Sequence, residues 1–133
     1  NACSELDNIN YTPTLSHDYV NDRYPQLLEQ YAASIAAASY SPCIKYWENT
    51  AAGCLTFMEI TKKNRGSYLG FEDDVSSIFI DEKNYRDKFQ EFIDDPNNPK
   101  WEKIANNGRE FSLTNLNNDN ATESLRLLVK DLM

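Results

Sequence analysis

The chain has 133 residues, of which 41 % are apolar and 12 % aromatic, enough for one globular domain with an ordinary core. Its net charge of −8 argues against nucleic acid or an anionic membrane as a partner, because Lys and Arg bind such surfaces. No apolar run approaches the roughly 20 residues that span a bilayer. We therefore expect a single soluble domain without an integral membrane segment.

The cysteines and the histidine form no metal-binding pattern. Cys3, Cys43 and Cys54 match no zinc spacing, and His17 is the single histidine of the chain. We expect free thiols in a reducing compartment, and hence a cytoplasmic protein. The chain begins at Asn1 with no signal-like apolar segment, so we expect it to be a piece of a longer protein.

The first third of the chain alternates helical and strand-like patterns after a polar N-terminal stretch. A helix is predicted from Arg23, with Pro25 in its first turn. Residues 33–39 form a short run of small apolar residues. Periodicity alone does not distinguish helix from strand there, but a position between two helical patterns favours a buried parallel strand. Ser41 and Pro42 then form a good helix start, a capping hydroxyl followed by proline.

The middle of the chain is predicted to contain two more strands. The helix that starts at Pro42 should end at Ala52, because Gly53 tolerates a positive φ. Residues 54–60 have the apolar character of a second strand, and a basic loop follows them. After an irregular acidic stretch, residues 78–80 form a third short strand.

Three helices are predicted in the C-terminal third. Tyr85 opens an amphipathic pattern that Pro96 stops, and Asn98 with Pro99 starts a second helix in which Gly108 is either a tolerated weak point or an end. Asp119 or Asn120 is expected to cap the last helix. Its apolar stripe consists of Leu125, Leu128, Val129 and Leu132.

Strands that alternate with helices predict crossover connections and a parallel sheet. We therefore expect an α/β fold, a Rossmann-like half with a small parallel sheet flanked by helices and with the C-terminal helices packed on it. Residues 1–133 would form one such domain. Three strands are few for a sheet of this kind, so a fourth is expected in the N-terminal stretch or upstream of it.

Ligands of open parallel sheets bind beyond the carboxyl ends of the strands. This rule selects the loops over residues 39–45, 59–66 and 81–84. The first leads into the helix that starts at Pro42, whose N-terminus and nearby Lys45 suit a phosphate. The second carries Lys62, Lys63 and Arg65, which could bind a diphosphate through charge-assisted hydrogen bonds. Solvated loop residues without a ligand are the alternative.

Glu48 is the most specific single candidate for a residue that binds a ligand. It lies about two turns into its predicted helix, so it could face either the strand ends or solvent. A carboxylate beside a ribose can accept hydrogen bonds from both vicinal hydroxyls, because its two oxygens are acceptors only. From the residues alone, an ordinary exposed helix glutamate is the alternative.

Residues 45–54, Lys-Tyr-Trp-Glu-Asn-Thr-Ala-Ala-Gly-Cys, resemble the glutamate-bearing helix of GT-B glycosyltransferases. In that family a Glu-x-x-Ala-x-Gly pattern closes the helix before a short apolar strand. Residues 68–73 and 79–81 are similar to the loop and strand that follow, and residues 101–111 resemble a late helix of these enzymes. The best match is to the group-1-like or spore-protein-like subgroup, over roughly residues 23–133.

This resemblance implies a C-terminal donor-binding domain, whose enzyme moves a sugar from a nucleotide-diphosphate sugar to an unknown acceptor. In the family the matching glutamate binds the donor ribose, which assigns that role to Glu48 and turns Ser41 to Lys45 toward the diphosphate. Catalysis in the family needs no bound metal, and no other cofactor is implied. The acceptor would bind to a missing N-terminal domain, so this fragment alone is expected to be inactive, and no catalytic residue is assigned.

The chain departs from the family pattern in two places. Many members carry a second glutamate eight residues before the first, where this chain has Tyr40, and residues 59–62 replace the usual Gly-Gly turn. The predicted site residues are Glu48, Ser41, Lys45, Tyr40, Lys62 and Arg65. The substitution at Tyr40 supports the alternative of a non-catalytic Rossmann-like binding or interaction module. A flavodoxin-like regulatory domain would need acidic residues after the first strand, and residues 33–39 supply none.

Overall fold

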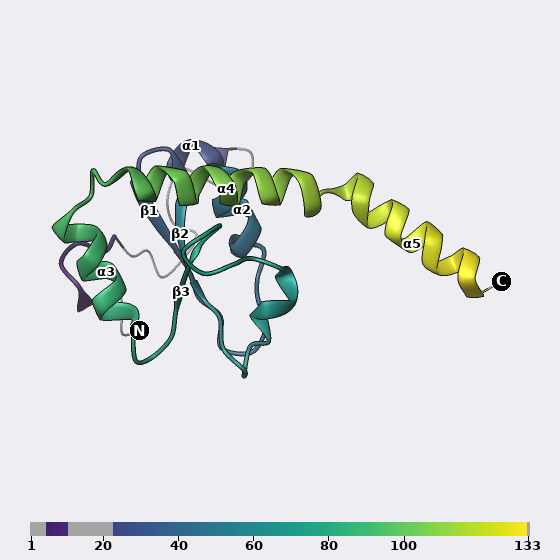
Figure 1. Ribbon diagram of the computed structural model, residues 1–133, viewed down its shortest axis with the longest axis horizontal. Coiled ribbons are helices and arrows are strands. Elements are labelled where there is room, and N and C mark those ends of the chain that lie inside the picture. Colours follow the sequence, from purple (N-terminus) through teal and green to yellow (C-terminus); the bar gives the residue numbers. More distant parts are fainter. Residues whose placement is uncertain (1–4, 11–22, 133) are drawn as a thin grey trace.

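The computed structural model describes residues 5–10 and 23–132, and Figure 1 shows their arrangement. The elements in chain order are α1 (Tyr24–Leu28), β1 (Ala33–Ala36), α2 (Lys45–Ala51), β2 (Leu55–Glu59), the 3-10 helix η3 (Gly66–Leu69), β3 (Ile78–Ile80), α3 (Tyr85–Asp94), α4 (Pro99–Asn115) and α5 (Asn118–Leu132). The strands form one parallel sheet in the order β1-β2-β3. The expected α/β fold, a small parallel sheet flanked by helices, is confirmed. Residues 5–10 contain no strand, and the rest of the N-terminal stretch lies outside the described residues.

Strand β2 is the centre of the sheet. Its register places Phe57 beside Ile35 of β1 and Ile78 of β3. Four of its five residues are buried, as expected for a parallel strand covered on both faces. Strands β1 and β2 are shorter than the predicted 33–39 and 54–60, whereas β3 coincides with its prediction.

The predicted start of α2 is wrong and its predicted end is confirmed. The helix begins at Lys45, and its N-cap residue makes no side-chain capping bond. Pro42 is buried and packs beside Gly66, so tertiary contacts hold this stretch outside the helix. At the other end Gly53 has a φ of +87°. Its amide donates to the Thr50 carbonyl at 2.9 Å, part of a Schellman cap in which the amide of Cys54 donates to the Asn49 carbonyl at 3.1 Å.

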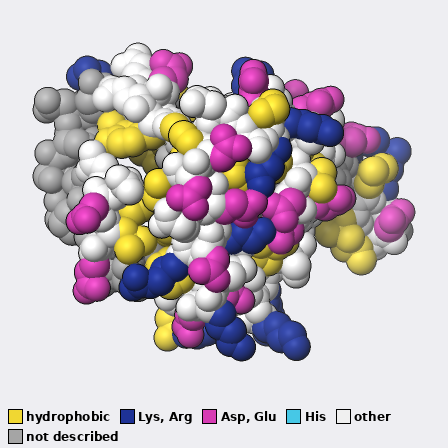
Figure 2. All heavy atoms as spheres, turned by 60° about the vertical axis from the view of Figure 1, so that its left-hand side comes forward, with side chains coloured by type: hydrophobic (Ala, Val, Ile, Leu, Met, Phe, Trp, Pro, Cys, Tyr) yellow, Lys and Arg dark blue, Asp and Glu magenta, His cyan; other side chains and the backbone are white. Residues whose placement is uncertain are grey.

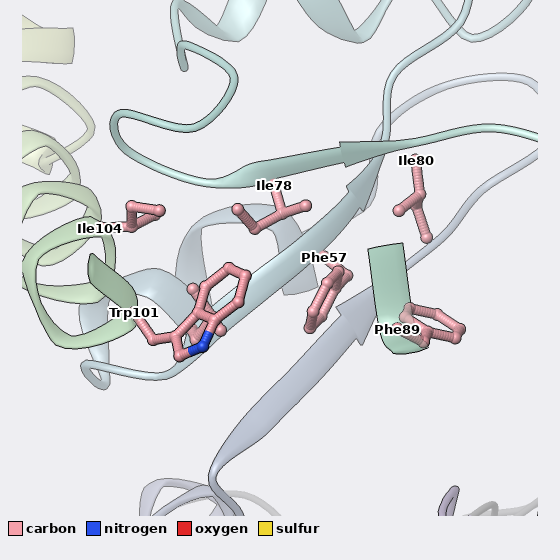
Figure 3. Close-up of a cluster of buried hydrophobic side chains, with 7 residues drawn as sticks. Phe57, Ile78, Ile80, Phe89, Trp101 and Ile104 are labelled. Carbon is pink, nitrogen blue, oxygen red and sulfur yellow. The ribbon is translucent and has the colours of Figure 1, made fainter. Parts of the chain in front are cut away.

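Side chains alternate across the sheet, so β2 contributes to two hydrophobic clusters. The first combines strand residues with α3 and α4, and Figure 3 shows most of it. Its buried members are Leu55, Phe57, Ile78, Ile80, Phe89, Trp101 and Ile104. The second combines Ala36 and Met58 of the strands with Tyr46, Leu69 and Phe71. Helices α2, α3 and α4 therefore cover the sheet by burying their apolar faces.

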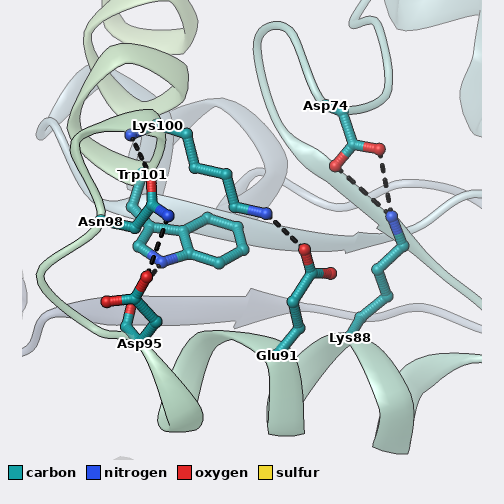
Figure 4. Close-up of polar contacts among 7 residues, drawn as sticks. All are labelled: Asp74, Lys88, Glu91, Asp95, Asn98, Lys100 and Trp101. Atoms are coloured by element: carbon teal, nitrogen blue, oxygen red, sulfur yellow. Dashed lines mark hydrogen bonds and ion pairs between the residues drawn. The ribbon is translucent and has the colours of Figure 1, made fainter.

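Trp101 connects the first cluster to the turn between α3 and α4 (Figure 4). The indole is 5 % exposed, and its N–H donates to the carbonyl of Asp95 at 2.8 Å. Asn98 caps α4 by accepting the amide of Lys100 at 3.0 Å, as the sequence predicts. Trp101 is therefore a core residue of the first cluster.

Helix α5 departs from the expected packing. Asn117 accepts the amide of Asn120 at 2.9 Å and so caps the helix, whereas the predicted caps Asp119 and Asn120 lie inside it. Every described residue of α5 is exposed, and Figure 1 shows the helix extending away from the rest of the molecule. The expectation that all C-terminal helices pack on the sheet therefore holds for α3 and α4 and is wrong for α5. The predicted apolar stripe is present on α5, but a stripe alone does not determine what it contacts.

Candidate functional site

The loops that follow β1 and β2 lie against each other at the carboxyl edge of the sheet. The contact is made through the backbone of Ala38, which lies in the loop after β1, two residues beyond the end of the strand. Its amide donates to the Glu59 carboxylate at 3.0 Å, and its carbonyl accepts from the Asn64 side chain at 3.1 Å. The expected juxtaposition of these two loops is therefore present.

Asn64 is the residue that holds this edge together. Its side chain is 1 % exposed and makes five hydrogen bonds. Besides the carbonyl of Ala38, the amide nitrogen faces the Glu59 carbonyl at 2.6 Å and the Tyr46 hydroxyl at 3.3 Å, so three acceptors share its two N–H hydrogens. Its oxygen accepts the amides of Thr61 at 3.0 Å and Gly66 at 2.9 Å. Both ends of the loop after β2 are thereby fixed.

Sequence reasoning missed Asn64 because it lies among basic residues. The available signal was the spacing Thr61-x-x-Asn64, in which each side chain bonds the other residue's amide, as in a capping box. The hydroxyl of Thr61 accepts the amide of Asn64 at 3.1 Å. Such reciprocal bonds indicate a fixed turn, so the loop presents its other side chains from a rigid backbone.

Tyr46 and Glu59 also belong to this hydrogen-bond network around Asn64. The hydroxyl of Tyr46 donates to the carbonyl of Glu59 at 2.9 Å, and the side chain is fully buried. Burial, followed by the nearby Glu59 carboxylate, raises the pKa of Tyr46, because both disfavour a phenolate. Tyr46 therefore stays neutral as a hydrogen-bonding group at ordinary pH.

The predicted basic residues lie on the outer side of this fixed loop. Lys62, Lys63 and Arg65 are exposed, and Arg65 has a φ of +56° at the turn into η3. Lys63 Nζ is 4.7 Å from the ring centroid of Tyr40, which is 79 % exposed. Lys and Arg side chains project at the lower end of Figure 2, the end at which Figure 1 shows the loops after β1 and β2.

None of these cations forms an ion pair with an acidic residue in the described part of the chain. Within residues 5–10 and 23–132, the ion pairs are Lys88–Asp74, Lys100–Glu91 and Arg126–Glu123 (the first two in Figure 4). None of them involves Lys62, Lys63 or Arg65. The loop therefore offers unneutralised positive charge in a chain whose net charge is −8.

Ser41 and Lys45 are placed differently from the prediction. Both are exposed, and Lys45 is the first residue of α2, so Ser41 lies before the helix and does not cap it. A helix of seven residues that begins at Lys45 does not provide the predicted phosphate site over Ser41 to Lys45. Both residues have exposed side chains that could contact a ligand.

Glu48 is half-buried in α2 and lies near α1. Burial, followed by the nearby Glu48 carboxylate, raises the pKa of Tyr24. The Tyr24 hydroxyl is 3.5 Å from the side-chain oxygen of Asn49, the next residue in α2. The structure thus brings Glu48 together with Tyr24, and its contact with a ribose stays a prediction from the resemblance.

The acidic segment before β3 has structural contacts. Asp73 accepts the amide of Phe79 at 2.7 Å, and Asp74 pairs with Lys88 at 3.2 Å. A shallow hollow between this segment and α4 is lined by Glu72 and Glu110 among other residues, with no Lys or Arg. Its charge does not suit a diphosphate. In the described part of the chain, no group of three His, Cys, Asp or Glu residues is placed to hold a metal ion.

The remaining candidates are mostly outside the site. Cys43 and Cys54 are free thiols, and burial raises the pKa of Cys54. Cys3 and His17 lie outside the described residues. Among the residues that the structure describes, no helix is long and apolar enough to cross a membrane.

Comparison of the chain with models of protein families, with curated proteins and with solved structures found no match. The resemblance to GT-B glycosyltransferases therefore stays a prediction that rests on the residues quoted for it.

Proposed function

We propose that this chain is the donor-binding domain of a glycosyltransferase and that it binds a nucleotide-diphosphate sugar at the carboxyl edge of its sheet. One observation carries the proposal. The exposed cations Lys62, Lys63 and Arg65 lie on a fixed loop beside the loop of Tyr40, at the edge where parallel sheets bind ligands.

The charge of this edge supports an anionic ligand. The chain as a whole repels anions, and these three residues have no ion-pair partner within the described residues. A diphosphate placed among them would gain charge-assisted hydrogen bonds, each worth about 1.5–3 kcal/mol. Ser41 follows Tyr40 directly in the chain, and Lys45 is the exposed first residue of α2, so both could add to the binding of an anion at this edge.

The rigidity of the loop supports the same conclusion. The five hydrogen bonds of Asn64 fix the loop backbone before any ligand arrives. Ordering a flexible loop would oppose binding, and a preformed loop avoids that entropy loss. The side chains themselves remain long and exposed, so part of the ordering still occurs on binding.

The remaining roles come from the resemblance. Glu48 would bind the ribose, and Tyr40 would contact the sugar or the base in place of the family's glutamate. The acceptor and any catalytic base would belong to a second domain outside these 133 residues. We also place the protein in the cytoplasm, which the free thiols of Cys43 and Cys54 support.

The test is titration of the chain with UDP, GDP and their sugars, followed by calorimetry or ligand-observed NMR. We expect Lys62→Ala/Lys63→Ala to weaken diphosphate binding by about tenfold or more, since tenfold corresponds to about 1.4 kcal/mol. The matched control is Lys103→Ala/Lys130→Ala, which removes the same charge from exposed positions on α4 and α5. Equal weakening in both variants, or no binding by the unmodified chain, would contradict the proposal.

The second candidate is a non-catalytic binding or interaction module. The start of α2 at Lys45 favours it, because the capped helix N-terminus expected to hold the diphosphate is not formed. Tyr40 in place of the family's glutamate points the same way. A stable fold that binds none of the nucleotides would support this candidate.

A further inference from the structure

Helix α5 has an apolar stripe that nothing in the described part of the chain covers. Its fifteen residues are all exposed. The largest apolar exposures along the stripe are 61 % at Leu125, 56 % at Leu128 and 79 % at Leu132. A helix of about this length is marginal in water by itself, so a partner that covers the stripe would stabilise it.

The spacing of the stripe fits another helix. Ala121, Leu125, Leu128 and Leu132 follow one another at intervals of four, three and four residues. This is the a and d pattern of a two-helix seam, and Val129 of the same stripe, which is 47 % exposed, lies beside the seam at a flanking position. Leu127 lies off this seam although it is also exposed.

The distribution of charge indicates which helix fits. Residues 118–132 contain three acidic and two basic side chains, so of the chain's net charge of −8 only −1 belongs to α5. The helix can therefore approach a copy of itself with little repulsion, whereas the rest of the chain, at −7, is repelled by its own copy. A second copy of the chain can therefore pair with α5 if the acidic remainders of the two chains, here called the bodies, stay apart.

We propose that α5 is a self-association surface and that two copies of this chain pair through it in antiparallel orientation. Leu125 of each copy would then lie opposite Leu128 of the other, and Ala121 opposite Leu132, a small residue against a large one. Because α5 extends away from the body (Figure 1), this orientation places the bodies at opposite ends of a helix pair roughly 20 Å long.

The flanking positions agree with this orientation. Asp131 would face Ser124 of the other copy, so no like charges meet beside the seam. The helix dipoles of an antiparallel pair also attract, and those of a parallel pair repel. A membrane surface fits less well, because residues 118–132 contain no aromatic side chain and have no Lys- or Arg-rich face.

The experiment is sedimentation equilibrium of the full 133-residue chain from micromolar to near-millimolar concentration at physiological salt. The measured average molecular mass should rise from 15.3 kDa, the mass of one chain, toward twice that value as the concentration increases. Leu125→Ser/Leu128→Ser should remain monomeric with an unchanged melting temperature of the body, because α5 lies outside the core. Leu127→Ser, which removes a leucine of similar exposure away from the seam, should associate like the unmodified chain.

Orientation is tested by the single variant Ala121→Cys under oxidising conditions. In an antiparallel pair the two introduced thiols are about 16 Å apart and do not form a disulfide. Cross-linking above that of the unmodified chain would overturn the antiparallel arrangement. A chain that stays monomeric throughout would overturn self-association, as would a dimer that survives Leu125→Ser/Leu128→Ser. In flotation experiments the chain should not bind to anionic vesicles. If the chain bound to the vesicles and did not dimerise, the proposal would also be overturned.

Discussion

Gly108 lies where α4 packs tightly against Ser76 in the loop before β3. A Cβ at this position would overlap the carbonyl oxygen of Ser76, and it would lie 3.4 Å from the carbonyl carbon of Ser76 and 3.5 Å from Cγ2 of Thr50. We predict that Gly108→Ala destabilises the fold. The test is informative because a helix interior by itself favours alanine.

Two effects of opposite sign decide the result. Replacing glycine by alanine inside a helix stabilises it by about 1 kcal/mol. To restore an ordinary contact of roughly 3.5 Å with the Ser76 backbone, α4 must move by on the order of 1 Å. Overpacking of this kind costs about 1–3 kcal/mol, and a backbone carbonyl cannot rotate away as a flexible side chain can.

The neighbouring contacts enlarge the penalty. One turn further along α4, the hydroxyl of Ser112 lies 2.6 Å from that of Thr50, both buried. Asn107 donates to the carbonyl of Val75 at 2.9 Å. A shift of α4 strains both bonds, so we expect a net loss of about 1–2 kcal/mol in the free energy of unfolding.

The assay is urea unfolding followed by the fluorescence of the two tryptophans. Asn106→Ala is the matched control, since it is an exposed α4 position at which alanine adds helix propensity without a clash. We expect the control to be equally or slightly more stable than the unmodified chain. A Gly108→Ala variant as stable as that control would refute the close packing of α4 on Ser76.

Two further predictions concern the polar network at the carboxyl edge. Asn64→Ala should lower the free energy of unfolding by about 2–4 kcal/mol in urea titrations, because it leaves buried amides and carbonyls without partners. Thr61→Ala, which removes only the bond from the backbone amide of Asn64 to the Thr61 hydroxyl, should lower the free energy of unfolding by about 1 kcal/mol, and equal losses in the two variants would argue against the central role of Asn64. Stability should also fall as pH rises above 10.0, the ordinary pKa of tyrosine, because unfolded Tyr46 loses its proton there while folded Tyr46 keeps it. The stability of Tyr46→Phe should fall less steeply with pH over the same range. An unchanged slope would show that Tyr46 is not the group responsible.

The sequence predicts the order of helices and strands well because those signals are local. Gly53 ends α2 with a positive φ, and the cap at Asn98 starts α4. The start of α2 could not be predicted in the same way. Ser41 and Pro42 form a good local start signal, but the bonds to Ala38 and the packing of Pro42 against the next loop override it.

The candidate site shows the same division between local and tertiary information. Basic residues in the loop after β2 are visible in the sequence, and their placement at the carboxyl edge follows from the parallel sheet. The spacing Thr61-x-x-Asn64 is a local signal for the turn, but the bonds of Asn64 to Ala38 and Tyr46 join separate segments and are not contained in any local pattern. The position of Glu48 near Tyr24 likewise depends on how α1 packs against α2.

The polar network also constrains how this edge could recognise a ligand. The buried side chain of Asn64 bonds to the loop backbones, and the half-buried Glu59 carboxylate accepts one bond, from the amide of Ala38, so these hydrogen bonds join the two loops to each other. The groups that remain outward are the flexible cations and the exposed ring of Tyr40. Such a surface distinguishes ligands mainly by their charge and only weakly by their shape. Binding there should therefore weaken steeply with salt, and a particular sugar would have to be distinguished by residues outside this edge.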